Sequence, residues 1–234
     1  MSAVIVTGAG GAIGQAIARR FSEEGRRVIC VDRDEHVLDL CDELDDAVPC
    51  VVDLTADDAP ERVLLAAEEG GDAAVLVNNA AITRDGRALK LDLDDFRLVI
   101  RVNLVAPLRL AEAVAPRLSD GGSIINIASR AALGNFGQAN YVAAKSALIG
   151  ATRALAVQWA PRLRVNAVAP GLVDTPMTEA MPPDVYAKLV ARVPAERAAD
   201  PAEVADAVAY LASDRASYIT GQMLLACGGR SVAG

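Results

Sequence analysis

The chain has 234 residues, of which 53% are hydrophobic, and it carries a formal net charge of −8. This size allows a full hydrophobic core and suits one large α/β domain, which we expect to span residues 1–234. The acidic balance gives no basic field to attract nucleic acid, and no run approaches the roughly 18 apolar residues of a membrane span, so we expect a cytoplasmic protein without either partner.

Short runs rich in Val and Ile alternate along the chain with longer segments of helical period, such as residues 13–24 and 200–213. The runs are apolar on both faces, which is typical of buried parallel strands. The pattern predicts a Rossmann-type doubly wound parallel sheet of about seven strands, with helices on both faces and a ligand crevice at the carboxyl ends of the strands. The expected strands are Ala3–Val6, Arg27–Val31, Pro49–Val52, Ala73–Val77, Ser123–Ile127, Arg164–Val168 and Met223–Ala226.

A glycine-rich stretch, "TGAGGAIG" at residues 7–14, separates the first expected strand from the first helix. Glycines there let the main chain approach a pyrophosphate, whose charge the free N–H groups of the helix N-terminus stabilise. The alternative is that the glycine-rich stretch is only a tight connection between the strand and the helix. Asp32 ends the second strand, where a carboxylate can bind the ribose hydroxyls of a dinucleotide, whereas Asp32 or Asp34 can also cap the next helix. We assign the ribose to Asp32 and the cap to Asp34.

The carboxylate of Asp32 also bears on the choice of cofactor. It repels a 2′-phosphate, which predicts NAD in preference to NADP. Arg33 gives the opposite possibility, because a guanidinium beside the pocket can pair with that phosphate, although an arginine after a strand is commonly a solvated charge.

A second constellation, "SRAALGNFGQANYVAAK", spans residues 129–145. Tyr141 and Lys145 are four apart, so a helix brings them to one face, and Ser129 leaves a strand end at the same crevice. The alternatives are that Ser129 only caps the end of the strand and that the spacing of Tyr141 and Lys145 arises by chance. His36 is the only histidine and lies far from Ser129, which disfavours a Ser-His-Asp hydrolase or a zinc site, and we expect no metal.

With these motifs in place, the sequence resembles the short-chain dehydrogenase/reductase family over essentially its whole length. Within that family it looks most like the 3-oxoacyl-(acyl carrier protein) reductases. Beyond the two stretches above, the resemblance rests on "VDL" at 52–54, "NNAAITRDG" at 78–86, "RVNLVAP" at 101–107, "INIAS" at 125–129, "RVNAVAPGLVDTPMT" at 164–178 and "YLASDRASYITGQ" at 210–222.

The resemblance implies an oxidoreductase that transfers hydride between NAD(P) and a secondary alcohol or ketone, such as a 3-hydroxyacyl or 3-oxoacyl compound. It makes Tyr141 the general acid/base, Lys145 its activator and a ligand of the nicotinamide ribose, Ser129 the hydroxyl that orients the carbonyl, and Asn103 the holder of a water in the proton relay. Two alternatives are a nucleotide-sensing protein without chemistry and an NADPH-dependent biosynthetic ketoreductase.

The resemblance also implies a set of cofactor contacts and a substrate lid at about residues 175–195. Asp53 and Leu54 would flank the adenine, and the loop after the sixth strand would surround the nicotinamide carboxamide. The full set of expected cofactor residues is Gly8, Gly10, Gly11, Ala12, Ile13, Gly14, Asp32, Arg33, Asp53, Leu54, Asn79, Ala80, Ala81, Tyr141, Lys145, Pro170, Gly171, Val173 and Thr175.

Three positions depart from the family pattern. Ala12 stands where a glycine is usual, and its methyl group would crowd a pyrophosphate unless the turn adjusts. Gly11 lies where NADP-preferring relatives often have a basic residue, which agrees with Asp32. Cys227 replaces the usual Asp or Asn before two glycines, and we interpret it as a buried thiol, with a redox role as the alternative.

The helix that carries the Tyr–Lys pair predicts self-association. Residues 142–159 are apolar around most of the circumference, more than one sheet face requires. Family members commonly pair through this helix and its neighbour at about 96–118. We therefore expect a homo-oligomer, a tetramer or a dimer.

Overall fold

A computed structural model of the chain describes residues 2–69 and 72–233. Its centre is one parallel sheet of seven strands in the order β3-β2-β1-β4-β5-β6-β7. This confirms the predicted sheet, and each strand lies within two residues of its expected position. The strands are β1 Ala3–Thr7, β2 Val28–Asp32, β3 Ala47–Val51, β4 Ala73–Asn78, β5 Ser123–Ile127, β6 Arg164–Pro170 and β7 Met223–Ala226.

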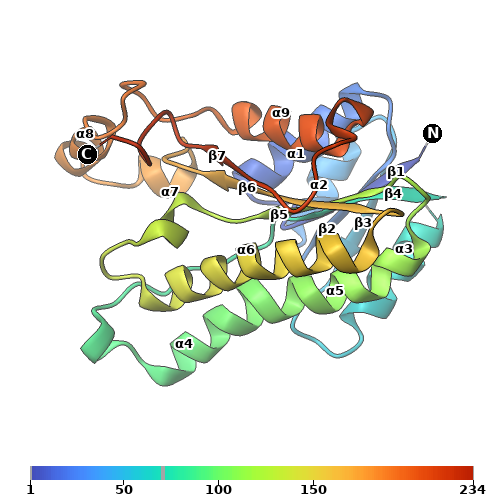
Figure 1. The fold of residues 1–234 in the computed structure, drawn as a ribbon, viewed down its shortest axis with the longest axis horizontal. Coiled ribbons are helices and arrows are strands. Elements are labelled where there is room, and N and C mark those ends of the chain that lie inside the picture. Colours follow the sequence, from blue (N-terminus) through green and yellow to red (C-terminus); the bar gives the residue numbers. More distant parts are fainter. Residues whose placement is uncertain (1, 70–71, 234) are drawn as a thin grey trace.

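Helices cover both faces of the sheet (Figure 1). Helices α1, α2 and α9 lie on one face, and α3, α4, α5 and α6 lie on the other. The α-helices are α1 Ala12–Glu23, α2 His36–Asp42, α3 Ala59–Glu69, α4 Leu93–Ile100, α5 Ala106–Val114, α6 Ala139–Trp159, α7 Pro176–Glu179, α8 Pro183–Val190 and α9 Pro201–Ala212. Short 3₁₀ turns are η1 Ala88–Lys90, η3 Ala115–Arg117, η4 Arg130–Leu133 and η5 Asp214–Ala216, and η2 Arg101–Val105 is a π-helical turn.

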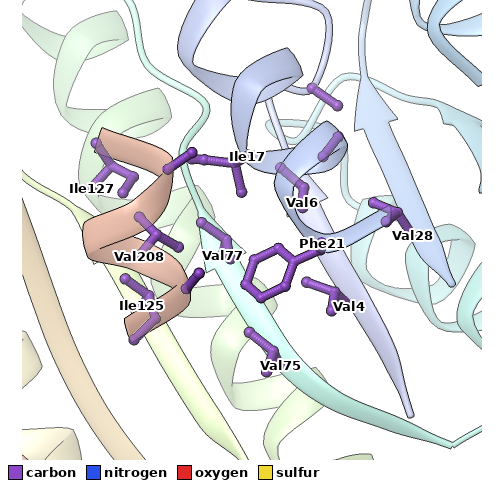
Figure 2. Close-up of a cluster of buried hydrophobic side chains, with 14 of the residues drawn as sticks. Val4, Val6, Ile17, Phe21, Val28, Val75, Val77, Ile125, Ile127 and Val208 are labelled. Carbon is purple, nitrogen blue, oxygen red and sulfur yellow. The ribbon is translucent and has the colours of Figure 1, made fainter. Parts of the chain in front are cut away.

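Alternation along the strands divides the core into two layers. In β1, Val4 and Val6 point toward α1 and α9, where they meet Phe21 of α1 (Figure 2). Ala3 and Ile5 point to the opposite face and pack with Leu110 of α5. Because successive side chains of a strand point to opposite faces, a strand that is apolar throughout requires helices on both sides.

Helix starts differ in how they are capped. Asp200 caps α9 by accepting a hydrogen bond from the N–H of Ala202 at 2.8 Å. Helix α2 begins at His36 with Glu35 at the cap position, but Asp34 accepts a hydrogen bond from the N–H of His36 at 3.3 Å. Asp34 therefore caps α2 as expected, from the position just before the cap residue Glu35.

The carboxyl ends of all strands lie at one edge of the sheet, the same side of the molecule as α7 and α8 in Figure 1. The strand order reverses between β1 and β4, so the connections after these strands diverge to opposite faces and leave a crevice. Among the helices that the structure describes, none is long and apolar enough to cross a bilayer.

Candidate active site

The turn after β1 has no room for larger side chains at two glycines. Gly8 has a positive φ of 64°, and a Cβ there would come within 2.7 Å of the Cα of Ala80. A Cβ at Gly14 would collide with the carbonyl oxygen of Gly8. These positions keep the turn close to α1 and to the loop after β4, as a phosphate-facing turn requires.

The N-terminus of α1 is open for an anion. Its cap position is Gly11, which provides no side-chain hydrogen bond, and its first turn contains no acidic residue. The first-turn N–H groups of a helix have no partner within the helix and favour negative charge. Of the residues expected at the pyrophosphate, Ala12 and Ile13 lie in this first turn, whereas the N–H groups of Gly10 and Gly11 donate to Asp32 and to the carbonyl oxygen of Gly8.

Asp32 lies at the edge of this turn with its carboxylate held in place. One oxygen accepts a hydrogen bond from the N–H of Gly10 at 2.9 Å, and the other accepts one from the N–H of Asp34 at 3.1 Å. Arg33 beside it is exposed. Hydrogen bonds from Thr55 lower the pKa of Asp53, and the nearby charge of Arg33 lowers it further. Arg33 is thus close enough to act electrostatically on the carboxylate expected beside the adenine.

A buried threonine joins the loops after β1 and β4. The hydroxyl of Thr7 accepts hydrogen bonds from the N–H groups of Asn79 and Ala80 at 3.0 and 3.1 Å. The side chain of Asn79 donates in return to the carbonyl oxygens of Thr7 and Gly8, both at 3.0 Å. These reciprocal bonds hold Asn79 and Ala80, with the adjoining exposed Ala81, against the glycine turn, where cofactor contacts are expected.

Ser129, Tyr141 and Lys145 come together at the carboxyl end of β5. Ser129 follows β5 directly, and its hydroxyl accepts a hydrogen bond from the N–H of Ala131 at 3.1 Å, so it also caps η4. Tyr141 and Lys145 are one turn apart on α6, with the Lys145 Nζ 5.8 Å from the centroid of the Tyr141 ring. Ser129 lies close enough to the Tyr141 hydroxyl to act on the Tyr141 pKa.

Burial dominates the electrostatics of this trio. It raises the pKa of Tyr141; the nearby Ser129 side chain opposes this shift, and the charge of Asp85 adds to it. Burial also lowers the pKa of Lys145 to about 7. The Lys145 ammonium group donates a hydrogen bond to the carbonyl oxygen of Ile127 at 2.7 Å, which holds it beside the end of β5.

Asn103 is fully buried in the π-helical turn between α4 and α5. Its side-chain oxygen accepts a hydrogen bond from the N–H of Ile82 at 2.9 Å, and its amide nitrogen donates to the carbonyl oxygen of Ile82 at 2.8 Å. π-Helical turns are rare in proteins, and those that occur are often found at functional sites. This pair of bonds ties the turn to the loop that follows β4.

The loop after β6 packs against the chain beyond β7. Pro170 ends β6, and the N–H of Gly171 donates to the carbonyl oxygen of Ala226 at 2.8 Å. A Cβ at Gly171 would approach the Cα of Cys227 to 2.8 Å. Val173 is buried. The loop therefore has a fixed course past the crevice.

Helices α7 and α8 occupy most of the expected lid. Thr175 and Thr178 form a reciprocal cap, in which the N–H of Thr175 donates to the Thr178 hydroxyl at 2.8 Å. The hydroxyl of Tyr186 on α8 donates to Asp174 at 2.7 Å.

Cys227 is buried as expected. Burial raises the pKa of its thiol, but hydrogen bonds with Ser231 and neighbouring N–H groups lower that pKa overall.

Comparison with known proteins identifies the chain's relatives. The family model described as Enoyl-(Acyl carrier protein) reductase matches residues 8–231. The chain is 38% identical over 235 residues to a 3-oxoacyl-(acyl-carrier-protein) reductase of Thermotoga maritima, and the match covers 96% of each protein. The chain belongs to the short-chain dehydrogenase/reductase family. It is accordingly an oxidoreductase that acts on CH–OH or ketone groups with NAD(P).

Solved structures of other short-chain dehydrogenases/reductases share the fold. A protein from Brucella melitensis described as a glucose/ribitol dehydrogenase superposes with a TM-score of 0.93 at 33% identity, covering 98% of this chain and 96% of that one. The ligand-free aldohexose dehydrogenase of Thermoplasma acidophilum gives 0.90 at 35% identity, covering 100% and 95%. Relatives this similar have names that refer to different substrates, so similarity alone leaves the substrate open.

Sequence reasoning did not single out Thr7, Asn126 or Thr152, which join segments around this dehydrogenase/reductase site; Asn78 was expected to line the cofactor but is buried and bonded to Asn126. For Thr7, its place at the head of the glycine stretch was a signal. A buried chain of hydrogen bonds runs from the Asn78 amide to Asn126 and from Asn126 to the Thr152 hydroxyl, each at 2.9 Å. This chain ties β4 and β5 to α6, the helix that carries Tyr141, and only the folded contacts reveal it.

Proposed function

We propose that the chain interconverts a secondary alcohol and a ketone using NAD in preference to NADP, with 3-hydroxyacyl or 3-oxoacyl compounds as the candidate substrates. The observation that carries the proposal is the grouping of Ser129, Tyr141 and Lys145 at the carboxyl edge of the sheet, the edge at which the uncapped N-terminus of α1 also lies. A bound nicotinamide ring supplies or accepts the hydride. The side chains of this protein orient the substrate, exchange its proton and stabilise the charge that develops on its oxygen.

Tyr141 exchanges the proton of the substrate oxygen. Its raised pKa keeps the phenol protonated at neutral pH, which is the form that donates a proton to a developing alkoxide during reduction. Ser129 donates a hydrogen bond to the same oxygen and stabilises the charge that develops there. For oxidation the phenolate is needed, and a charged Lys145 close to the ring stabilises it.

Asn103 orients a water that connects Lys145 to solvent. Each amide can donate two hydrogen bonds, and its oxygen can accept two. Ile82 uses one of each at Asn103, so a donor and an acceptor remain for a water.

Substitution of Tyr141 by Phe tests the catalytic assignment. Loss of the phenol proton should lower kcat by at least about 100-fold, while NADH binding, in which Tyr141 is one expected contact among many, should weaken far less. Tyr210→Phe on the exposed side of α9 is the matched control and should leave kcat unchanged. Unchanged turnover in Tyr141→Phe contradicts the assignment. Binding of NADH without turnover on a panel of ketones and alcohols would favour the nucleotide-sensing alternative.

The preference for NAD rests on the charges around the ribose. Asp32 is held at the turn, and the guanidinium of Arg33 has the Asp53 carboxylate near it. Parallel calorimetric titrations with NADH and NADPH should show tighter binding of NADH, and Asp32→Asn should narrow the difference. Tighter binding of NADPH would make Arg33 the deciding residue and favour the biosynthetic ketoreductase, and no binding of either would point to Ala12.

We also propose a homo-oligomer, a tetramer or a dimer, formed through the outer faces of α4, α5 and α6. These faces expose large apolar side chains: Leu93 is 60% and Val157 is 83% accessible. A monomeric mass in solution would refute this proposal.

The four unpaired thiols support a reducing, cytoplasmic location. Residues 175–195 are proposed as a lid that covers the bound substrate.

A further inference from the structure

Three arginines line one hollow near the carboxyl edge of the sheet. Arg130 comes from η4, Arg192 follows α8, and Arg230 follows β7. The hollow has a volume of about 710 Å³ and is also lined by Phe136, whose ring is exposed, and by Glu196. The catalytic and cofactor assignments above use none of these residues.

The three guanidinium groups have no partner among the residues that the structure describes. Within residues 2–69 and 72–233, none of them makes a hydrogen bond or an ion pair, whereas arginines elsewhere on the surface, such as Arg117 and Arg197, pair with carboxylates. Glu196 lines the hollow but forms no ion pair with them, so among the described lining residues three arginines stand against one carboxylate. Burial lowers the pKa of Arg230, and the like charges of Arg130 and Arg192 lower it further. An anion would relieve this repulsion.

One wall of the hollow is formed by the segment that directly follows Ser129. Arg130 follows Ser129 directly, and η4 is anchored to α6 by a hydrogen bond from the Ser146 hydroxyl to the carbonyl oxygen of Ala132 at 2.9 Å. The loop after η4 is pinned by a bond from the N–H of Gly86 to the carbonyl oxygen of Gly137 at 2.8 Å. This wall is therefore held in place independently of any ligand.

The opposite wall joins the end of the lid to the C-terminal turn. The N–H of Ala195 donates to the carbonyl oxygen of Gly228 at 3.1 Å. A Cβ at Gly229 would lie 3.1 Å from the side chain of Pro194. Arg192 and Arg230 thus stand on two segments that pack against each other, on the side where the lid covers the substrate.

We propose that this arginine hollow binds an oxyanion that the substrate carries at a distance from its reacting carbon, namely a carboxylate or a phosphate. Guanidinium groups bind both with paired, charge-assisted hydrogen bonds. The exposed ring of Phe136 contacts the apolar part between the anion and the carbon that reacts at Ser129 and Tyr141. The inference rests on the proposed function, since it assigns an anionic class to the substrate of that same site.

Calorimetry with the cofactor site filled by saturating NADH tests the hollow directly. The probes are coenzyme A, which carries phosphates, and succinate, which carries carboxylates, both at one low salt concentration because salt screens such contacts. At least one probe should bind the wild type, and Arg230→Gln and Arg192→Gln should each weaken it about ten-fold or more. Arg117→Gln removes the same charge from an exposed ion pair elsewhere and should leave binding unchanged.

Each outcome has a defined meaning. Tighter binding of coenzyme A identifies a phosphate-bearing carrier, and tighter binding of succinate identifies a carboxylate on the substrate itself. Binding of neither probe, or equal weakening by Arg117→Gln, overturns the inference. The readout is binding and needs no turnover, so it is separate from the Tyr141→Phe test, and NADH binding is measured beforehand in the same instrument.

Discussion

Replacement of Lys145 by Met should increase the free energy of unfolding at acidic pH. This gain over the wild type should be much smaller at alkaline pH. Lys145 is buried, with 1% of its surface accessible, and burial lowers its pKa from 10.5 to about 7. Because each pKa unit corresponds to about 1.4 kcal/mol, keeping the amine charged in the folded state costs about 5 kcal/mol below pH 7.

The sign follows from proton binding. Between pH 7 and 10.5 the folded state binds fewer protons at Lys145 than the unfolded state does, so this cost is complete below pH 7 and disappears as pH rises toward 10.5. Met has a similar length and no charge. Its advantage over Lys in the free energy of unfolding should therefore shrink by about 3 kcal/mol between pH 6 and pH 9.5.

The hydrogen bond to Ile127 does not obscure this comparison. Met leaves the Ile127 carbonyl oxygen without its donor, which costs about 1–3 kcal/mol but at both pH values alike. The assay is urea unfolding of both proteins at the two pH values and one protein concentration, since self-association shifts apparent stability. Lys188→Met, at an exposed position of α8, is the control and should show no such change. A difference between wild type and Lys145→Met that does not vary with pH would refute the reasoning.

Two further changes test the local structure. Gly14→Ala should lower the free energy of unfolding by about 1–3 kcal/mol and weaken NADH binding, because its Cβ collides with the Gly8 carbonyl; Gly11→Ala, whose Cβ would have 3.6 Å of space, should cost far less, and equal effects would contradict the packing. Asp200→Ala should cost about 1 kcal/mol in urea unfolding through loss of the α9 cap. Glu35→Ala is the comparison, because Glu35 occupies the cap position of α2 but its side chain makes no capping hydrogen bond, and a similar loss there would argue against a specific capping effect.

Local sequence patterns were enough for the sheet and for much of the candidate site. Runs of Val and Ile with turn residues between them located all seven strands, because burial on both faces leaves a continuous apolar signature. The spacing of Tyr141 and Lys145 predicted a shared helix face, and the Asp32 carboxylate was expected at the glycine turn, where it now accepts a hydrogen bond from Gly10. The roles of these residues stay predictions until the variants are measured.

Tertiary structure decided what depends on distant segments meeting. Arg130, Arg192 and Arg230 are separated by up to 100 positions, and no periodicity relates them; they share a hollow because η4, the lid and the C-terminal turn pack at one edge of the sheet. The pKa of Lys145 likewise depends on how completely α6 and β5 exclude water around it. The sequence determines periodicity and local turns through short-range geometry, whereas convergence and desolvation exist only once the layers have packed.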